Sequence, residues 1–594
     1  MVRKGVKSNL IVFVLLGIVL SIGLIFAACK GPVGPAGERG TAGPAGSPGA
    51  AGSAGTAGPA GSAGARGAAG EPGSPGKAGP AGAAASVAPG PGLKATISKV
   101  DIAADGKVTV SYKLTDDKGN PVNRATDLDA NSERFSIARI ETDSASGLTR
   151  WLSYVLGDVK GAKFTFKGKQ MEPALAEVKG VPVSAADQTG EFKTVGPGEY
   201  TYTLKTVLPA NYDKNATHRI IYFGTRNTRA FVANATFDFV PAGGDVKVTR
   251  QIVATENCNQ CHDPLAIHGG TRRDTKTCVV CHTPQNIDPE SGNTPDLKVM
   301  IHKIHRGRNL PSVAVGKKDY FITGNAQNTF DFSEIGWPQD VRNCTTCHKN
   351  APNADNYKTA PSQAACGACH DNIDFATGKA RFGGRDHPGG PQANDNLCKV
   401  CHQADSGQEF DTSIVGAHTI PERSKQLKGV KLTLMAANVK PGEKPSVDFH
   451  VQDGSGAFID PNKMSFLELT IAHPTTDYAH RITEMVNQIV APPAPAFVRA
   501  GALAKLDMPG EHYRYTFKDP LDKDWKVTAA VGMAGYKSST IKGNEGKDVT
   551  VREADVNPVI YVSLDGSKVA PRRTVVKRDN CNQCHLDLGN PAGI

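Results

Sequence analysis

The stretch Cys258-Asn259-Gln260-Cys261-His262 carries the pattern around which this chain is organised. It is the first of six Cys-x-x-Cys-His motifs, which together use twelve of the thirteen cysteines. The spacing is the attachment signature of c-type haem, because two thiols form thioethers with the haem vinyl groups and the adjacent imidazole is placed under the iron. Six regular copies therefore predict a multihaem c-type cytochrome. The other five copies are Cys278–His282, Cys344–His348, Cys366–His370, Cys398–His402 and Cys581–His585.

The motifs define the predicted attachment and ligand residues. The predicted thioether cysteines are Cys258, Cys261, Cys278, Cys281, Cys344, Cys347, Cys366, Cys369, Cys398, Cys401, Cys581 and Cys584. The predicted proximal iron ligands are His262, His282, His348, His370, His402 and His585. Haem c is thus expected at six sites, five of them in residues 252–420.

Five further histidines lie between residues 252 and 420, as many as there are motifs in that segment. We predict that they are the distal ligands of five six-coordinate irons. Two of them lie three residues apart in a segment expected to be helical, 297–305, so they project from one face and can serve neighbouring haems. The sequence leaves open which distal histidine belongs to which motif. It also leaves open that one or two are surface residues beside an open iron. The five are His268, His302, His305, His387 and His418.

Residues 1–29 have the pattern of a targeting segment. Lys4 and Lys7 give a basic start, and an apolar run of 17 residues, Leu10–Phe26, follows. The small residues before Cys29 predict a lipoprotein signal peptide with lipidation at that cysteine. The alternative is an uncleaved transmembrane anchor, for which the apolar run is short. Both interpretations predict an exported, membrane-tethered chain.

Residues 30–91 are dominated by a strict Gly-x-y repeat that runs from Gly31 to Gly82. Period-three glycine is the collagen signature, because only glycine fits at the axis of the triple helix. Two interpretations stay open. One is a trimeric collagen-like stalk, and the other is a flexible or polyproline-like spacer, since proline is sparse.

The remaining chain reads as alternating β and haem domains. We expect β domains at 92–251 and 421–579, a pentahaem domain at 252–420, and the start of a second haem domain at 580–594. Alternating apolar residues bounded by turn signals predict antiparallel strands of a sandwich or barrel. Strands are expected at 95–100, 107–112, 200–206, 219–224 and 230–240.

The two β-plus-haem units resemble each other. Asn257–His262 and Asn580–His585 have the same six residues, Asn-Cys-Asn-Gln-Cys-His. A repeat of this length predicts duplication. We expect the second unit to be a truncated copy, because only nine residues follow its first motif. The alternative is a natural six-haem chain that borrows a distal ligand. The candidates for that ligand are His450, His473, His480 and His512.

These features resemble the outer-surface decahaem c-type cytochromes of the OmcA/MtrC type. The resemblance is carried by the first motif with the His268-Gly269-Gly270 that follows it, by Ile301-His302-Lys303-Ile304-His305, and by the order of β and haem segments. It implies split β-barrel domains beside loop-rich multihaem domains, and bis-histidine low-spin haems. The chain departs from the family in having six motifs instead of ten, in its Gly-x-y stalk, and in having no cysteine between Cys401 and Cys581.

The resemblance also implies a function, which is electron transfer at the outer cell surface. The acceptors would be ferric or manganese oxides, metal chelates or flavins, and the donor an outer-membrane cytochrome/porin complex. Substrate-specific catalytic residues are not expected, although outer-sphere metal reduction is. One alternative is a nitrite- or hydroxylamine-type oxidoreductase with an open iron, and another is a structural surface protein. Nucleic acid is not an expected partner, because the net charge of +10 comes without a basic run.

Overall fold

The computed structural model describes residues 89–182, 187, 189–324, 327–488 and 499–586. They belong to the second of two compact units, residues 85–594. The predicted lipidation site Cys29 and the Gly-x-y stalk lie outside the described residues. Within the described ranges, no helix combines the length and apolarity needed to cross a bilayer.

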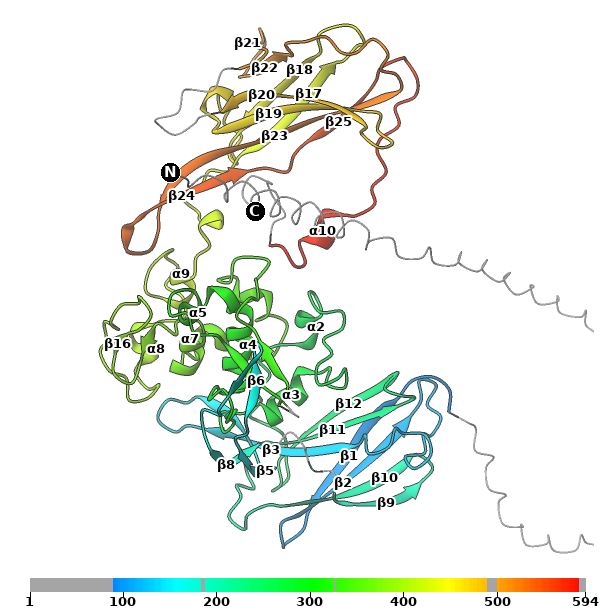
Figure 1. Cartoon of the computed structure of the whole chain (residues 1–594), viewed down its shortest axis with the longest axis vertical. Helices are drawn as coiled ribbons and strands as arrows, with labels where there is room; N and C mark the ends of the chain where they lie inside the picture. The colour runs from blue at the N-terminus through cyan, green and yellow to red at the C-terminus, as the bar shows by residue number, and fades with distance from the viewer. Residues whose placement is uncertain (1–88, 183–186, 188, 325–326, 489–498, 587–594) are drawn as a thin grey trace, which may run out of the picture. The chain divides into compact units, whose positions relative to one another are not determined.

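The first β region comprises β1 to β12, and its two main sheets are antiparallel throughout. One sheet has the order β1-β2-β10-β9, and its strands lie side by side in Figure 1. The other has the order β12-β11-β3-β4. The five strands expected from the sequence are confirmed. The strands of the two sheets are β1 (Lys94–Ile102), β2 (Lys107–Thr115), β3 (Arg134–Thr142), β4 (Thr149–Ser153), β9 (Glu191–Gly196), β10 (Glu199–Val207), β11 (His218–Arg226) and β12 (Phe231–Phe239).

Two small hairpin-like sheets complete this region. They pair β5 (Leu156–Lys160) with β8 (Glu177–Pro182) and β6 (Phe164–Phe166) with β7 (Lys169–Met171).

Strand β11 is buried along its whole length. Ile220 and Tyr222 point into the core shared by the two sheets. Ile221 and Phe223 point the other way and pack with Val280 of the following region. Successive side chains of a strand face opposite sides, so a strand that is apolar on both faces is one covered on both. This strand therefore joins the first β region to the segment that carries the motifs.

The haem-motif region, residues 255–423, has short helices, loops and little sheet. The expected helix at 297–305 is confirmed as α4 (Leu297–Arg306). The other helices are α2 (Thr255–Cys258), α3 (Thr275–Cys281), α5 (Pro311–Ala314), α6 (Asn356–Thr359), α7 (Gln363–Cys369), α8 (Cys398–Cys401), α9 (Ile414–Ala417) and the 3-10 turns η1 (Gly307–Asn309), η3 (Cys344–Thr346) and η4 (Pro421–Arg423). The two-stranded sheets pair β13 (Phe321–Thr323) with β14 (Thr329–Asp331) and β15 (Ile373–Asp374) with β16 (Lys379–Ala380).

This region has a sparse apolar core. Among its described residues, the buried apolar side chains are Val280, Leu310, Tyr320 and Ala368. Each β region buries a much larger cluster. Burial of apolar area is the main force that holds a domain together. A segment of this length with so few buried apolar residues needs other sources of cohesion.

The second β region repeats the first. Its sheets have the orders β17-β18-β22-β21 and β20-β19-β23-β24, with β25 paired to β23. The strands are β17 (Lys431–Asn438), β18 (Ser446–Gln452), β19 (Phe466–His473), β20 (His480–Gln488), β21 (Ala502–Lys505), β22 (Tyr513–Thr516), β23 (Thr528–Lys542), β24 (Asp548–Ala554) and β25 (Val559–Ser563). The 3-10 turns η5 (Pro461–Lys463) and η6 (Asn544–Gly546) and the final helix α10 (Arg578–Cys581) complete the described elements.

The strand registers show how closely the two β regions correspond. Tyr112 pairs with Tyr200 in the first region, and Phe449 pairs with Tyr513 in the second. The position of Tyr200 is thus taken by Tyr513. A sequence alignment from the shared pairs Gly198-Glu199 and Gly510-Glu511 would match Tyr200 with His512 instead. The second copy has one more residue before the strand.

Candidate c-type haem centres

Each motif forms the same closed turn. The backbone N–H of the motif histidine donates to the carbonyl of the first cysteine, at 2.8 to 3.0 Å, in all six motifs. This bond between residues four apart is the helical one. It brings both cysteines and the histidine onto one turn of chain. The sixth motif, Cys581–His585, has the same bond at 2.9 Å. Disulfides are absent among the described cysteines, all twelve of which belong to motifs.

The structure brings each of the first five motif histidines into ring contact with a different non-motif histidine. All ten histidines of the segment are used, each once. The distances between ring centroids are 5.7 Å for the closest pair and 6.3 Å for the widest. The pairs are His262 with His305, His282 with His268, His348 with His302, His370 with His418, and His402 with His387.

This spacing fits an iron between the two rings. Bonds from a metal to imidazole nitrogen are about 2 Å long, so two rings bound on opposite sides have centroids roughly 6 Å apart. The Nε2 atoms of His268 and His282 face each other at 3.5 Å. Among the described residues, no group of three or more His, Cys, Asp or Glu side chains could hold a metal ion. Pairs of this kind suit a metal that brings its remaining ligands with it, as haem iron does.

Hydrogen bonds hold several of these rings in the orientation that ligation requires. A ring whose Nδ1–H donates to a backbone carbonyl leaves its Nε2 lone pair free for a metal. His418 Nδ1 lies 2.7 Å from the carbonyl of Ile414, four residues earlier in α9. The other carbonyl partners of Nδ1 are Pro295 for His282, Ile301 for His305, Gly390 for His387 and Thr412 for His402.

Burial favours the neutral form of several of the paired imidazoles. It lowers the pKa of His268, His348 and His370 to about 4, and the paired imidazole is the next cause in each case. Burial also lowers the pKa of His302 and His305. The neutral ring is the form that binds a metal.

Helix α4 supplies two partners from one face. His302 contacts the histidine of the third motif, and His305 contacts that of the first. Between them, Lys303 Nζ donates to the Asp371 carboxylate at 2.9 Å, and both side chains are largely buried. Ser312 also donates to this carboxylate, through N at 3.0 Å and Oγ at 2.6 Å. Because Asp371 follows the fourth motif directly, this network ties α4 to it.

The turn after the first motif positions His268. His268, Gly269 and Gly270 all have positive φ, at 53°, 68° and 83°. Glycine suits Gly269 because of this backbone conformation, whereas the one close neighbour of a Cβ there, the end of the exposed Arg229 side chain, could move aside. The two glycines turn the chain so that His268 meets the second motif.

Polar contacts link the motifs in space. Asn257 Nδ2, beside the first motif, donates to the carbonyls of Cys347 and Lys349 in the third, at 2.8 and 2.7 Å. The sixth motif also packs on the first, because Cys584 Sγ lies 3.4 Å from the Gln260 carbonyl. Gln339 Nε2 donates to the Cys584 carbonyl at 3.1 Å.

His585 has a different environment. Within the part of the chain that the structure describes, no second imidazole packs against it. The four histidines considered as borrowed ligands contact one another instead: His450 packs on His512, and His473 on His480. His218 is a buried core residue, and its Nε2 lies 3.1 Å from Tyr154 Oη.

Comparisons with known proteins agree with this geometry. A family model, "Outer membrane cytochrome MtrC/MtrF-like, domains II/IV", matches residues 250–414, and a collagen triple helix repeat model matches residues 29–87. The multiheme cytochrome MtrC of Shewanella baltica (strain OS185) is 28% identical over 240 residues, which is 38% of this chain and 31% of that protein. The match therefore spans about a third of the length of this curated relative.

Two solved structures share the fold. The crystal structure of the outer membrane decaheme cytochrome OmcA has a TM-score of 0.60 at 21% identity, covering 83% of this chain and 75% of that one. The crystal structure of MtrC from Shewanella baltica OS185 has a TM-score of 0.56 at 20% identity, covering 83% and 74%. The chain resembles the OmcA/MtrC type in residues 250–414 and shares the fold of OmcA and MtrC. The resemblance drawn from its motifs is thereby confirmed.

Sequence reasoning missed the aromatic side chains around the paired histidines. The Trp337 ring meets His305 edge-on, with centroids 4.7 Å apart. Tyr357 packs on His348 and Phe375 on His387. Aromatic residues make up only 6% of the sequence, but no local pattern marks these three as neighbours of histidines.

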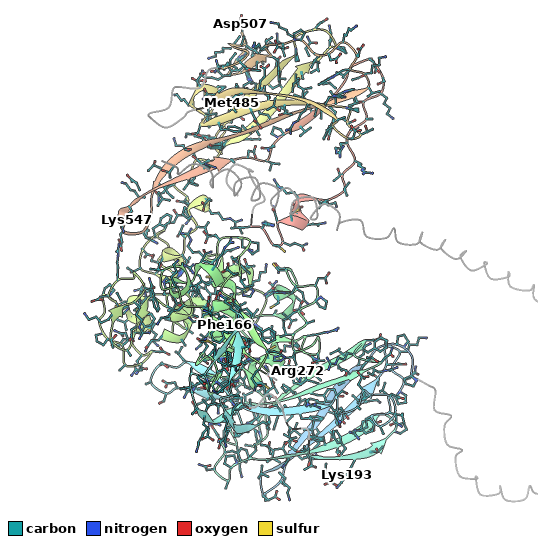
Figure 2. All side chains as sticks on the ribbon, in the orientation of Figure 1. Phe166, Lys193, Arg272, Met485, Asp507 and Lys547 are labelled. Carbon is teal, nitrogen blue, oxygen red and sulfur yellow. The ribbon has the colours of Figure 1, made fainter. Side chains whose placement is uncertain are left out.

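The first β region supports the second motif. Arg272, labelled in Figure 2, stands over the Phe223 ring, 3.6 Å from its centroid. Arg219 Nη1 donates to the Lys276 carbonyl in α3 at 3.0 Å. The Ser153 backbone N–H donates to the Gln285 side chain at 2.8 Å. These contacts fix the helix that carries Cys278 and Cys281.

Proposed function

We propose that this chain is a multihaem c-type cytochrome that transfers electrons at the outer cell surface to extracellular acceptors. The main support is that five motif histidines contact five different partner histidines in one region. The acceptors are ferric or manganese oxides, metal chelates or flavins. We propose these acceptors, and do not infer them from the curated relative, because the match covers only part of that protein.

The residue roles follow from the motif turns and the ring pairs. The twelve motif cysteines form the thioethers, the six motif histidines are proximal ligands, and His268, His302, His305, His387 and His418 are distal ligands. Haem c held at these sites supplies one-electron redox chemistry. An iron with two imidazole ligands has no open position for a substrate, so bond-making chemistry is not expected there. The nitrite- or hydroxylamine-type alternative is therefore not favoured.

The contacts between motifs support a branched order. The first motif touches the third and the sixth through Asn257 and Gln260. It also approaches the second, because Thr255 Oγ1 lies 3.1 Å from Asp274 Oδ1, the N-cap of α3. The fourth motif is linked to the first and third through α4. The fifth motif is linked to the fourth, because the Gln363 backbone N–H donates to Asp395 at 2.8 Å. An electron could then enter and leave at different ends.

The N-terminal segments complete the proposal. Lipidation at Cys29 would anchor the chain in the outer membrane, facing outward. Residues 30–91 would hold the rest away from the lipid, either as a homotrimeric collagen-like stalk or as a spacer. We also propose the domain limits expected from the sequence, and an outer-membrane cytochrome/porin complex as the electron donor.

Low-temperature EPR of the oxidised protein tests the proposal. We expect the five paired sites to be low-spin, because two imidazoles give a strong axial field. Replacing any one distal histidine with alanine should convert one haem to high-spin. The reduced wild-type protein should transfer electrons to chelated Fe(III) without binding it at a haem. A wild-type high-spin signal that survives deletion of residues 581–594 would contradict the assignment, because it would place an open iron among the five.

A further inference from the structure

Three side chains with metal-binding atoms, none of them from a haem motif, meet on the outer face of the β17-β18-β22-β21 sheet. His512 Nδ1 lies 3.1 Å from Met435 Sδ. The ring centroids of His450 and His512 are 4.9 Å apart, with an angle of 82° between the planes. Phe458 covers both rings, at 5.6 and 5.1 Å. The proposed electron-transfer function uses none of these residues.

The strand register explains why they meet. Asp448 pairs with Arg514 and Phe449 with Tyr513, so continuing the same register sets His450 opposite His512. Met435 is the extra residue at a β-bulge between Leu434 and Ala436. A bulge redirects a side chain relative to regular alternation. Here it leaves the thioether exposed on the same face as the two imidazoles.

The first β region holds a different set at the corresponding positions. Its β-bulge lies between Ile97 and Lys99, which makes Ser98 the counterpart of Met435. Lys113 pairs with Glu199, in the place of His450 and His512. These two form an ion pair at 3.4 Å. The same backbone arrangement thus carries an ion pair in one copy, and two imidazoles with a thioether in the other.

The histidine pair has an unsatisfied atom. His450 Nδ1 is buried and makes no hydrogen bond. Lys431 lies on the neighbouring strand, opposite Gln452, and adds positive charge to this face. The carboxylate on this face, Asp448, is held by Arg514 through two bonds of 2.6 and 2.7 Å. The cluster therefore offers nitrogen and sulfur, without a free carboxylate.

We propose that Met435, His450 and His512 form a binding site for a cuprous ion. Thioether sulfur selects Cu(I), and imidazole also suits copper. The nearby Lys431 and the lack of a carboxylate ligand disfavour divalent ions, which carry more charge. The site is distinct from the haem centres in its ligands and in its place in the fold.

The spacing fits this ion. With metal–nitrogen bonds of about 2 Å and metal–sulfur bonds of about 2.3 Å, a tetrahedral angle places the ring centroids roughly 5 Å apart and nitrogen roughly 3.5 Å from sulfur. The ring separation of 4.9 Å already matches. The sulfur at 3.1 Å has to move back slightly. Met435 is 40% exposed and unbranched, so it can do so.

Competition for Cu(I) tests the site in the full, haem-loaded chain. The protein is titrated anaerobically against a colorimetric Cu(I) chelator. Wild type should withdraw one equivalent of copper. Met435→Leu, which conserves volume, should weaken binding at least about tenfold, and His450→Gln should do the same. His480→Gln is the matched control, because His480 lies in β20 of the other sheet, where its ring packs on Trp525. Equal uptake by all four proteins, or uptake by none, would overturn the proposal.

X-ray absorption at the copper edge gives a second readout that the haem iron does not mask. The copper-loaded wild type should show one sulfur and at least two nitrogen neighbours. In Met435→Leu the sulfur should disappear. A sulfur signal that persists in this variant, or is absent from wild type, would mean that copper binds elsewhere on the chain.

Discussion

The buried ion pair between Lys303 and Asp371 should contribute strongly to the stability of the haem-motif region. Asp371→Asn removes the charge and keeps the shape, so the Lys303 ammonium is left without its carboxylate. The side chains of the pair are only 17% and 11% exposed. Removing one partner of a buried pair costs about 3–5 kcal/mol of unfolding free energy, since the other charge stays desolvated.

The lower end of this range applies here. Lys303 Nζ also lies 5.3 Å from the centre of the Tyr320 ring, which gives the ammonium a residual partner. A loss of about 3 kcal/mol corresponds to a fall in melting temperature of roughly 10 °C for a region of this size. Thermal unfolding, followed by circular dichroism and by the visible absorption of the haems, measures the change.

Asp386→Asn is the matched control. Asp386 pairs with Lys379 at 2.8 Å and is adjacent in sequence to His387, as Asp371 is to His370, but the pair is 72% and 57% exposed. We expect no measurable change, because water screens such pairs. The double replacement Lys303→Met with Asp371→Asn should recover most of the lost stability, because it leaves no buried charge and keeps an acceptor for Ser312. Equal losses for Asp371→Asn and Asp386→Asn would refute the reasoning.

Three further predictions follow from the site and the first β region. Replacing His302 with methionine should raise the reduction potential of the third-motif haem, and the same replacement at His305 should raise that of the first-motif haem, because methionine ligation favours the reduced iron. Redox titration of each variant against wild type measures the change. Trp337→Leu should shift the EPR g-values of one haem without creating a high-spin signal, because the ring that orients His305 is lost. Burial raises the pKa of Glu133 above 4.5, against the opposing charge of Arg124. The stability that its protonation contributes is therefore present below pH 4.5 and is lost as the pH rises through the raised pKa. Glu133→Gln should flatten this part of a plot of unfolding free energy against pH.

Local patterns made much of this structure predictable. The strands of the first β region follow from alternating residues such as Val108 and Val110, which are both fully buried. Helix α4 follows from the spacing of its apolar residues, and the motif turns from their own short sequence. In each case the information lies within a few residues, which is the range over which hydrogen bonding and alternation act.

The pairing of histidines was not predictable in the same way. His302 meets His348, and His370 meets His418, across long stretches of loop. The count of ten histidines limits the answer, but loop paths decide it, and loops carry no periodicity. The network of Lys303, Asp371 and Ser312 has the same non-local character. Charged residues next to a motif gave no sign that they would be buried.

The two β regions are alike in their inward residues and differ in their outward ones. The inward residues Tyr112 and Phe449 hold the same paired position, and both are buried in their cores. The outward positions differ, with Lys113 and Glu199 in one copy against His450 and His512 in the other. Packing constrains an inward side chain from every direction, whereas an outward one only has to suit its neighbours across the strands. New chemistry can therefore arise on the outer face of such a sheet without disturbing the fold, which is why we place the copper site there.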